Sequence, residues 1–177
     1  MKKLFAVLML AAVAIGVAVP VPALAVPATL NANTVFLLDQ SAVAVSTTGT
    51  TAEVTFATVN VPAGLVGPNG AIRIRAIFSH TSSANAKLLK FRYGGSLVGW
   101  ASITTSVASD LQVIVRSRGT LDSQITYTQP TAATTNLTST PTSVDGRIDQ
   151  PISIICSLAV STETCSLEAY SVEVLRP

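Results

Sequence analysis

The sequence predicts an all-β fold, an antiparallel two-sheet β-sandwich of the jelly-roll type with about eight to nine strands. Apolar and polar residues alternate with a period of two along most of the chain after residue 25. Turn sequences rich in Pro, Gly and Asn separate the alternating segments. No segment after residue 25 carries a sustained apolar helical stripe with caps. Together these observations favour two stacked β-sheets.

Residues 1–25 are typical of an export signal. A positive start at Lys2 and Lys3 is followed by the uncharged apolar run 4–19, and Ala23-Leu24-Ala25 offers small residues for cleavage. We therefore expect cleavage after Ala25. The alternative is an uncleaved membrane anchor, because 4–25 approaches the ~20 apolar residues that span a bilayer. We expect residues 26–33 to form a flexible lead and 34–177 a single β-sandwich domain.

Alternating apolar residues predict about nine strands after this lead. In the segment 72–78 the apolar residues Ile72, Ile74, Ala76 and Phe78 share one face, and Phe91 lies on the apolar row of 89–93. The stretch 129–145 is rich in Thr and Pro, so we expect a surface loop there. The full set of predicted strands is 34–38, 52–61, 72–78, 89–93, 97–105, the region around 113–118, 124–128, 152–158 and 165–175.

The composition leaves little material for catalysis or for binding of nucleic acid. Only 11% of the residues are charged, the net charge is +2, and the chain has one His and two Cys. A nearly neutral mature domain gives little attraction for nucleic acid or for an anionic membrane surface. His80 has no Cys or second His at metal-ligand spacing, and no Gly-x-Ser-x-Gly motif is present, so we expect a solvated or capping histidine. The sequence predicts no enzyme activity, no cofactor and no metal.

The basic and aromatic residues of the strands have two interpretations. Six basic side chains point away from the predicted core, and they form either a patch for an acidic glycan or nucleic acid, or charge pairs on a solvent or subunit face. Charge pairing is the simpler interpretation, with Glu168 and Glu173 of the final strand as partners for two of them. Trp100 and Tyr93 suit stacking on sugar rings, but core packing is the default for both. The six candidate surface or interface residues are Arg73, Arg75, Lys90, Arg92, Arg116 and Arg118.

The two cysteines give a specific structural prediction. Cys156 and Cys165 lie on the apolar faces of two consecutive strands, and Ser161-Thr162-Glu163 has the composition of a hairpin loop. Opposed residues of a hairpin lie close enough for a disulfide, which an oxidising compartment permits. In the cytoplasm the same pair would remain as two buried thiols.

Two stretches of sequence resemble a family of virion structural proteins of tailed bacteriophages. They are VPAGLVGPNGAIRIRAIFSHTSSANAKLLKFRYGG, residues 61–95, and CSLEAYSVEVL, residues 165–175. The shared features are a Pro-Ala-Gly turn, a Gly-Pro-Asn-Gly turn, an I-R-I-x-A-x-x-S strand, a K-x-L-x-x-R-x-G-G strand and a final L-E-A-Y-x-V-E strand. The resemblance implies a non-catalytic jelly-roll subunit of a tail, fibre or head decoration.

Two functional hypotheses follow. The first is a virion structural protein that assembles as a homo-oligomer, with a trimer favoured, and contacts other virion proteins or a host-surface glycan. The alternative is an exported bacterial adhesion or carbohydrate-binding module. Both predict a virion, extracellular or periplasmic location, with no nucleic-acid partner and no membrane contact after signal cleavage.

Overall fold

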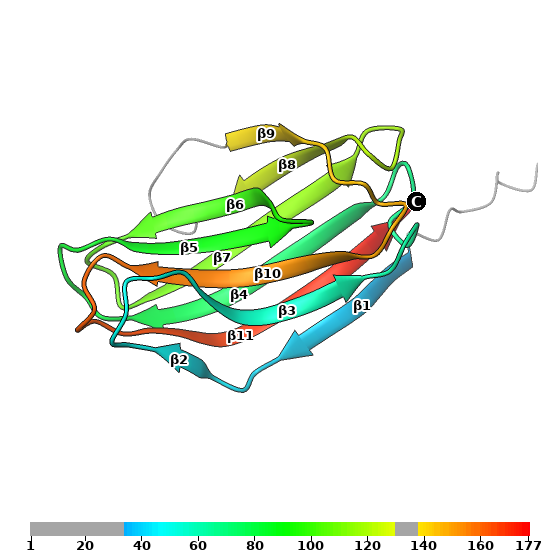
Figure 1. Cartoon of the computed structure of the whole chain (residues 1–177). Helices are drawn as coiled ribbons and strands as arrows, with labels where there is room; N and C mark the ends of the chain where they lie inside the picture. Colours follow the sequence, from blue (N-terminus) through cyan, green and yellow to red (C-terminus); the bar gives the residue numbers. More distant parts are fainter. Residues whose placement is uncertain (1–33, 130–137) are drawn as a thin grey trace, which may run out of the picture. The chain divides into compact units, whose positions relative to one another are not determined.

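The computed structural model describes residues 34–129 and 138–177, which form eleven strands in two antiparallel sheets (Figure 1). The predicted signal, 1–25, and the lead, 26–33, lie outside the described residues. The seven-stranded sheet has the order β1 (Thr34–Ser41), β11 (Cys165–Arg176), β4 (Ala71–His80), β7 (Ala108–Ser117), β8 (Gln124–Gln129) and β9 (Thr138–Thr142), and β2 (Val45–Thr47) pairs with β11. The four-stranded sheet has the order β3 (Val54–Val61), β10 (Gln150–Leu158), β5 (Lys87–Tyr93) and β6 (Ser96–Ile103).

The strand order confirms the predicted jelly roll. Among the described strands the chain crosses between the sheets at β2 to β3, β3 to β4, β4 to β5, β6 to β7, β9 to β10 and β10 to β11. The central order β1-β11-β4-β7 of one sheet therefore faces β3-β10-β5-β6 of the other, which is the two-sheet arrangement of a jelly roll. The β8–β9 hairpin extends the larger sheet beyond β7.

The core lies between the two sheets and follows the alternation seen in the sequence. Ile74 of β4 pairs with Val113 of β7 and Val172 of β11, and all three side chains have no exposed surface. On the facing sheet Phe91 of β5 pairs with Ile154 of β10, and both are equally buried. The prediction that Ile74 and Phe91 face the core is confirmed.

Two short strands lie outside the predicted set. β2 has only three residues, and β9 lies inside the stretch 129–145 that we expected to be a loop, of which 130–137 is outside the described residues. β9 has the sequence TSTPT, which lacks large apolar residues and carries no alternating signal. Pro141 is tolerated there because β9 pairs on one side only, with β8, and an edge strand does not need every N–H in a ladder. The loop prediction was wrong for residues 138–142.

A tight turn fixes the register of β5 and β6. Only Gly94 and Gly95 separate these strands, and their φ angles are 54° and 79°. Positive φ at both central positions is the type I′ geometry that suits the twist of a hairpin and favours glycine. The turn pairs Tyr93 with Ser96 and Arg92 with Leu97, and a register shift beyond these pairs places Lys90 of β5 directly opposite Trp100 of β6.

Candidate functional site

The outer face of the four-stranded sheet carries an exposed tryptophan, Trp100. Trp100 is 54% exposed and lies on β6, at the edge of this sheet. The register places it in a row across the sheet with Lys90 of β5, Ile155 of β10 and Thr55 of β3. Directly opposed residues of an antiparallel pair point to the same face, so this row forms one continuous strip.

A β-bulge turns Trp100 outward. The pairing of β5 with β6 shifts between Phe91 and Arg92, so Val98 and Gly99 are both buried and the phase changes before Trp100. A Cβ atom on Gly99 would lie 2.1 Å from Cγ2 of Val113 in the facing sheet, so this close approach requires glycine. The expectation that Trp100 packs in the core was wrong. The same expectation for Tyr93 is confirmed, because Tyr93 is only 3% exposed and burial raises the pKa of its hydroxyl.

A group of three charged side chains lies beside Trp100. Glu53, just before β3, forms ion pairs with both Lys90 and Arg92 of β5. Arg92 Nη2 lies 3.3 Å from Glu53 Oε2, and Arg92 Nη1 donates to the carbonyl oxygen of Gly95 at 3.2 Å. The hydrogen bond from Lys90 is the main cause that lowers the pKa of Glu53, and Arg92 adds to it. We call Glu53, Lys90 and Arg92 the charged triad.

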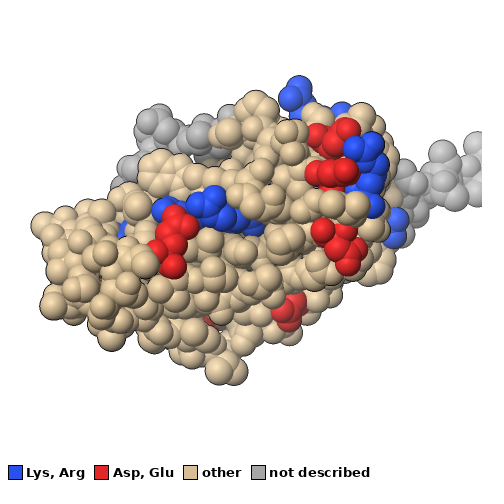
Figure 2. All heavy atoms as spheres, in the orientation of Figure 1, with Lys and Arg blue, Asp and Glu red and all other residues tan. Residues whose placement is uncertain are grey.

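The triad stands apart from other charged side chains on this face. Figure 2 shows one group of blue and red spheres over the middle of the four-stranded sheet, and a second group at the end of the sandwich. Around the triad the outward positions of β3 and β10 carry hydroxyl side chains, including Thr58 and Ser153, which lie in the row of Arg92. The outer face of the four-stranded sheet therefore combines an exposed aromatic ring, the charged triad and several hydroxyl side chains.

The partners of Lys90 and Arg92 differ from those predicted. We expected the strand of Lys90 and Arg92 to lie beside the final strand, with Glu168 and Glu173 in reach. In the jelly roll β5 lies beside β10, and β11 belongs to the other sheet. Glu173 instead pairs with Arg73 at 2.9 Å, and Glu168 accepts a hydrogen bond from Ser79.

The remaining basic candidates lie on the seven-stranded sheet, so the six do not form one patch. Arg73 and Arg75 belong to β4, and Arg75 Nε donates to Asp110 of β7 at 3.0 Å. Arg116, at the end of β7, and Arg118, just after it, are exposed. Charge pairing is thus present for four of the six side chains, two on each sheet.

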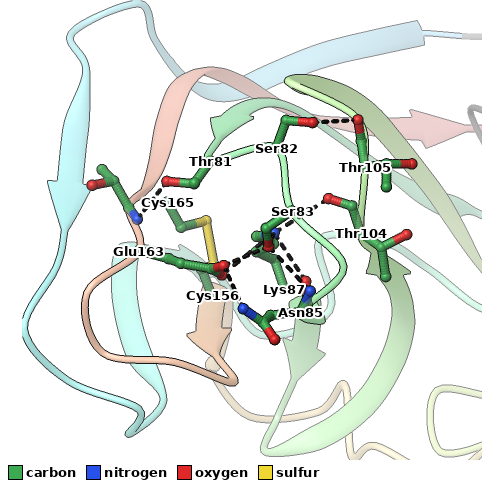
Figure 3. Close-up of polar contacts among 11 residues, drawn as sticks. Thr81, Ser82, Ser83, Asn85, Lys87, Thr104, Thr105, Cys156, Glu163 and Cys165 are labelled. Atoms are coloured by element: carbon green, nitrogen blue, oxygen red, sulfur yellow. Dashed lines mark hydrogen bonds and ion pairs between the residues drawn. A yellow bond between two sulfur atoms is a disulfide. The ribbon is translucent and has the colours of Figure 1, made fainter.

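A second polar cluster is buried at one end of the sandwich (Figure 3). Lys87 Nζ donates to Ser83 Oγ at 2.7 Å, to the carbonyl oxygen of Asn85 at 2.9 Å and to that of Thr104 at 3.2 Å, and it lies 3.3 Å from Glu163 Oε2. Glu163 Oε1 accepts hydrogen bonds from Ser83 and, at 2.9 Å, from Asn85. These bonds, with that from Ser83 as the largest cause, lower the pKa of Glu163. The cluster connects three loops.

This buried cluster has a structural role. The Lys87 side chain has no exposed surface and that of Glu163 is 7% exposed, so an external ligand does not reach the ammonium group. The sequence analysis missed Lys87, although Lys87 has the same parity along β5 as the buried Leu89 and Phe91. A lysine on an inward row is the signal that would have identified it, since a buried lysine requires a partner.

The predicted disulfide is present, but it does not join a hairpin. Cys156 and Cys165 are bonded, with their Cα atoms 6.7 Å apart, and both side chains are fully buried. Cys156 lies on β10 of the four-stranded sheet and Cys165 on β11 of the other, so the bond links the two sheets beside Glu163 (Figure 3). The expected direct hairpin of these strands was wrong, because the connection from β10 to β11 crosses from the four-stranded sheet to the seven-stranded sheet.

His80 is buried and not solvated as we expected. It is 7% exposed, at the end of β4, and its Nε2 lies 2.9 Å from Ser109 Oγ. Burial, with a smaller effect from the Lys87 charge, lowers the pKa of this histidine. Within residues 34–129 and 138–177 no three His, Cys, Asp or Glu side chains group as metal ligands. In the same part of the chain no helix is long and apolar enough to cross a membrane.

Comparisons with known proteins show resemblance in fold only. No protein-family model matches the chain, and no curated protein matches it. Among solved structures the chain is similar to basic winged bean lectin with Tn-antigen, at a TM-score of 0.37 and 8% identity over 80% of this chain and 98% of that one. It is similar at a TM-score of 0.36 and 9% identity to a lectin from Bauhinia forficata in complex with GalNAc, over 80% and 97% of the two chains. A structure of infectious bursal disease virus Gx strain matches at a TM-score of 0.23 and 11% identity, over 81% and 42%. These values assign neither a family nor a ligand to the chain.

Proposed function

We propose that this protein is an exported, non-enzymatic module that binds glycans on the outer face of its four-stranded sheet. The observation that carries the proposal is the exposed indole of Trp100 beside the charged triad and the hydroxyl side chains of the same face. The proposal corresponds to the second of the two hypotheses from the sequence.

The chemistry of this face suits a sugar. The C–H groups of a pyranose ring pack against an aromatic face, and the hydroxyls around the ring need donors and acceptors nearby. Trp100 supplies the aromatic surface, and Lys90 lies directly opposite it as a donor. Ser153 and Thr58, one row away, add hydroxyls that donate and accept. An exposed tryptophan in such surroundings is typical of a recognition surface.

The disulfide supports export. Disulfides persist in oxidising environments such as the periplasm or the cell exterior, and reducing compartments keep thiols free. The buried bond between Cys156 and Cys165 therefore favours a protein that folds outside the cytoplasm. Export also brings the glycan-binding face into contact with surface polysaccharides.

A virion subunit is a second candidate, and the edge strand β1 favours it. Val35, Phe36 and Leu37 are consecutive and are 52%, 41% and 51% exposed at the edge of the seven-stranded sheet. Exposed apolar edge strands pair readily with other chains, so this edge supports assembly of a homo-oligomer. The resemblance to phage virion proteins is what favours a trimer. A glycan-binding face on such a subunit would contact the host surface.

A glycan array tests the main proposal. Wild-type protein, Trp100→Ala and the control Ile77→Ala are labelled equally and applied to the same array. Ile77 is an exposed apolar residue, 41% accessible, on β4 of the other sheet. We expect wild type and the control to bind a common set of glycans, and Trp100→Ala to lose at least about tenfold in affinity, as for a central aromatic anchor. Absence of glycan binding by the wild type, or unchanged binding by Trp100→Ala, would contradict the proposal.

A further inference from the structure

The charged triad indicates which class of glycan the face recognises. Building on the proposed function, we infer that the ligand is an acidic sugar, a uronic or sialic acid, whose ring stacks on Trp100 and whose carboxylate binds Lys90 and Arg92. The inference rests on the register of three strands and on the charge balance of the triad.

The strand register places the stacking residue Trp100 next to the carboxylate-binding residue Lys90. Lys90 and Trp100 are directly opposed on β5 and β6, where Cβ atoms lie about 4.5 to 5.5 Å apart. A carboxylate on a sugar is attached at the margin of the ring. When that margin of a ring stacked on the indole of Trp100 is turned toward β5, the carboxylate meets Lys90 and Arg92, which lie two residues apart on the same face.

The triad carries an excess of positive charge. Two cations share the carboxylate of Glu53, because both Lys90 and Arg92 form ion pairs with it. The bonds to Glu53 and to the carbonyl oxygen of Gly95 leave most N–H donors of the two cations uncommitted within the described part of the chain. The fork of Arg92 matches a carboxylate in shape and in charge. An external carboxylate would balance the remaining charge.

Partial burial strengthens this preference. The Lys90 side chain is 17% exposed and that of Arg92 is 35% exposed, so both are less screened than freely extended surface cations. Glu53 forms ion pairs with both cations and so fixes them before a ligand arrives, and Ile155, the residue of β10 opposite Lys90, is buried. Side chains held in place in this way lose less conformational entropy on binding.

A matched pair of ligands isolates the carboxylate. Sialyllactose and tetragalacturonic acid are titrated by calorimetry into the full protein, each beside its methyl ester, which keeps the rings and removes the charge. We expect each acid that binds to bind about tenfold more tightly than its ester, the size of one charge-assisted hydrogen bond. We expect this ratio to fall when NaCl is raised, because salt screens the contact.

Three substitutions separate charge recognition from stacking. Lys90→Gln and Arg92→Gln should each lower affinity for the acid by a larger factor than affinity for the ester, so the ratio of the two affinities falls. Glu53→Gln should raise affinity for the acid, because the amide oxygen of Gln still accepts hydrogen bonds from the two cations, whereas the negative charge that repels a ligand carboxylate is removed. Trp100→Ala should lower the affinities for the acid and for the ester by the same factor. The thermal unfolding temperature of each variant is measured in parallel to show that it is folded.

The outcomes distinguish this inference from the function on which it rests. Equal affinity for acid and ester, together with loss of both in Trp100→Ala, overturns the acidic ligand and leaves glycan binding in place. An acid preference unchanged in Lys90→Gln and Arg92→Gln also overturns the inference, because the triad then only stabilises the fold. Absence of binding by both acids, both esters and the glycan array contradicts the proposed function itself.

Discussion

Breaking the disulfide between Cys156 and Cys165 should destabilise the protein by a definite amount without unfolding it. The two cysteines are nine residues apart in sequence. In the chain-entropy model, closing a loop of that length removes conformational entropy of the unfolded chain that corresponds to about 2.6 kcal/mol at 25 °C. For a domain of this size such a loss lowers the Tm by about 5 to 10 °C.

The fold should survive this loss because the core does not depend on the bond. Buried apolar residues from both sheets form one continuous cluster around Ile74 and Phe91. A domain of about 150 residues buries roughly two thirds of the surface that its unfolded chain exposes. Both sulfurs are buried, so a reductant reaches them only when the chain opens, and reduction requires unfolding first.

The assay is urea denaturation of protein that has been unfolded and then refolded with or without a reductant. Reduced protein keeps both thiols and nearly the same packing, so the difference reports the cross-link. The double variant Cys156→Ala, Cys165→Ala serves as a control and should lose more, because it also removes two buried sulfur atoms. A difference below about 1 kcal/mol, or failure of the reduced chain to refold, would refute the reasoning.

Three further predictions concern the core, pH and assembly. Phe91→Ala should lower the free energy of unfolding by about 3 to 5 kcal/mol in urea, and a loss below ~1 kcal/mol would mean that Phe91 does not face the core. Because burial lowers the pKa of His80 from its ordinary value near 6.5, the unfolded chain binds more protons, so stability should fall as pH drops below about 6.5. Thermal unfolding between pH 7 and 5 should show this slope, and a slope equally steep in His80→Gln would exclude the histidine as its cause. Sedimentation at tens of micromolar should show an oligomer, and a trimer is the state that the resemblance to phage virion proteins implies, whereas a monomer would count against assembly through β1.

Alternation in the sequence was sufficient to predict the layers and the core. Ile74 and Phe91 were assigned inward because their neighbours two residues away are also apolar, and both are fully buried. The jelly-roll type was predicted correctly too. The period-two pattern arises from the pleat of a single strand, so it is the same whichever strand lies beside it.

Pairing between strands could not be predicted in the same way. The sequence does not state that β5 lies beside β10, so Glu53 was missed and Glu168 and Glu173 were wrongly chosen as partners of Lys90. The bulge before Trp100 could not be predicted either. Val98 and Gly99 are both buried, and two buried residues in succession break the alternation that was used to assign residues to faces. The candidate site depends on both features, which explains why the fold was predicted better than the site.

Trp100 allows the central claim to be tested directly, because it is the only tryptophan of the chain. Its fluorescence reports the environment of the proposed sugar platform without a label. Titration with a glycan selected on the array should shift the emission to shorter wavelength and saturate, with a Kd equal to that from calorimetry. Binding seen by calorimetry with no change in the emission of Trp100 would contradict the account, because the ligand would then lie elsewhere on the protein.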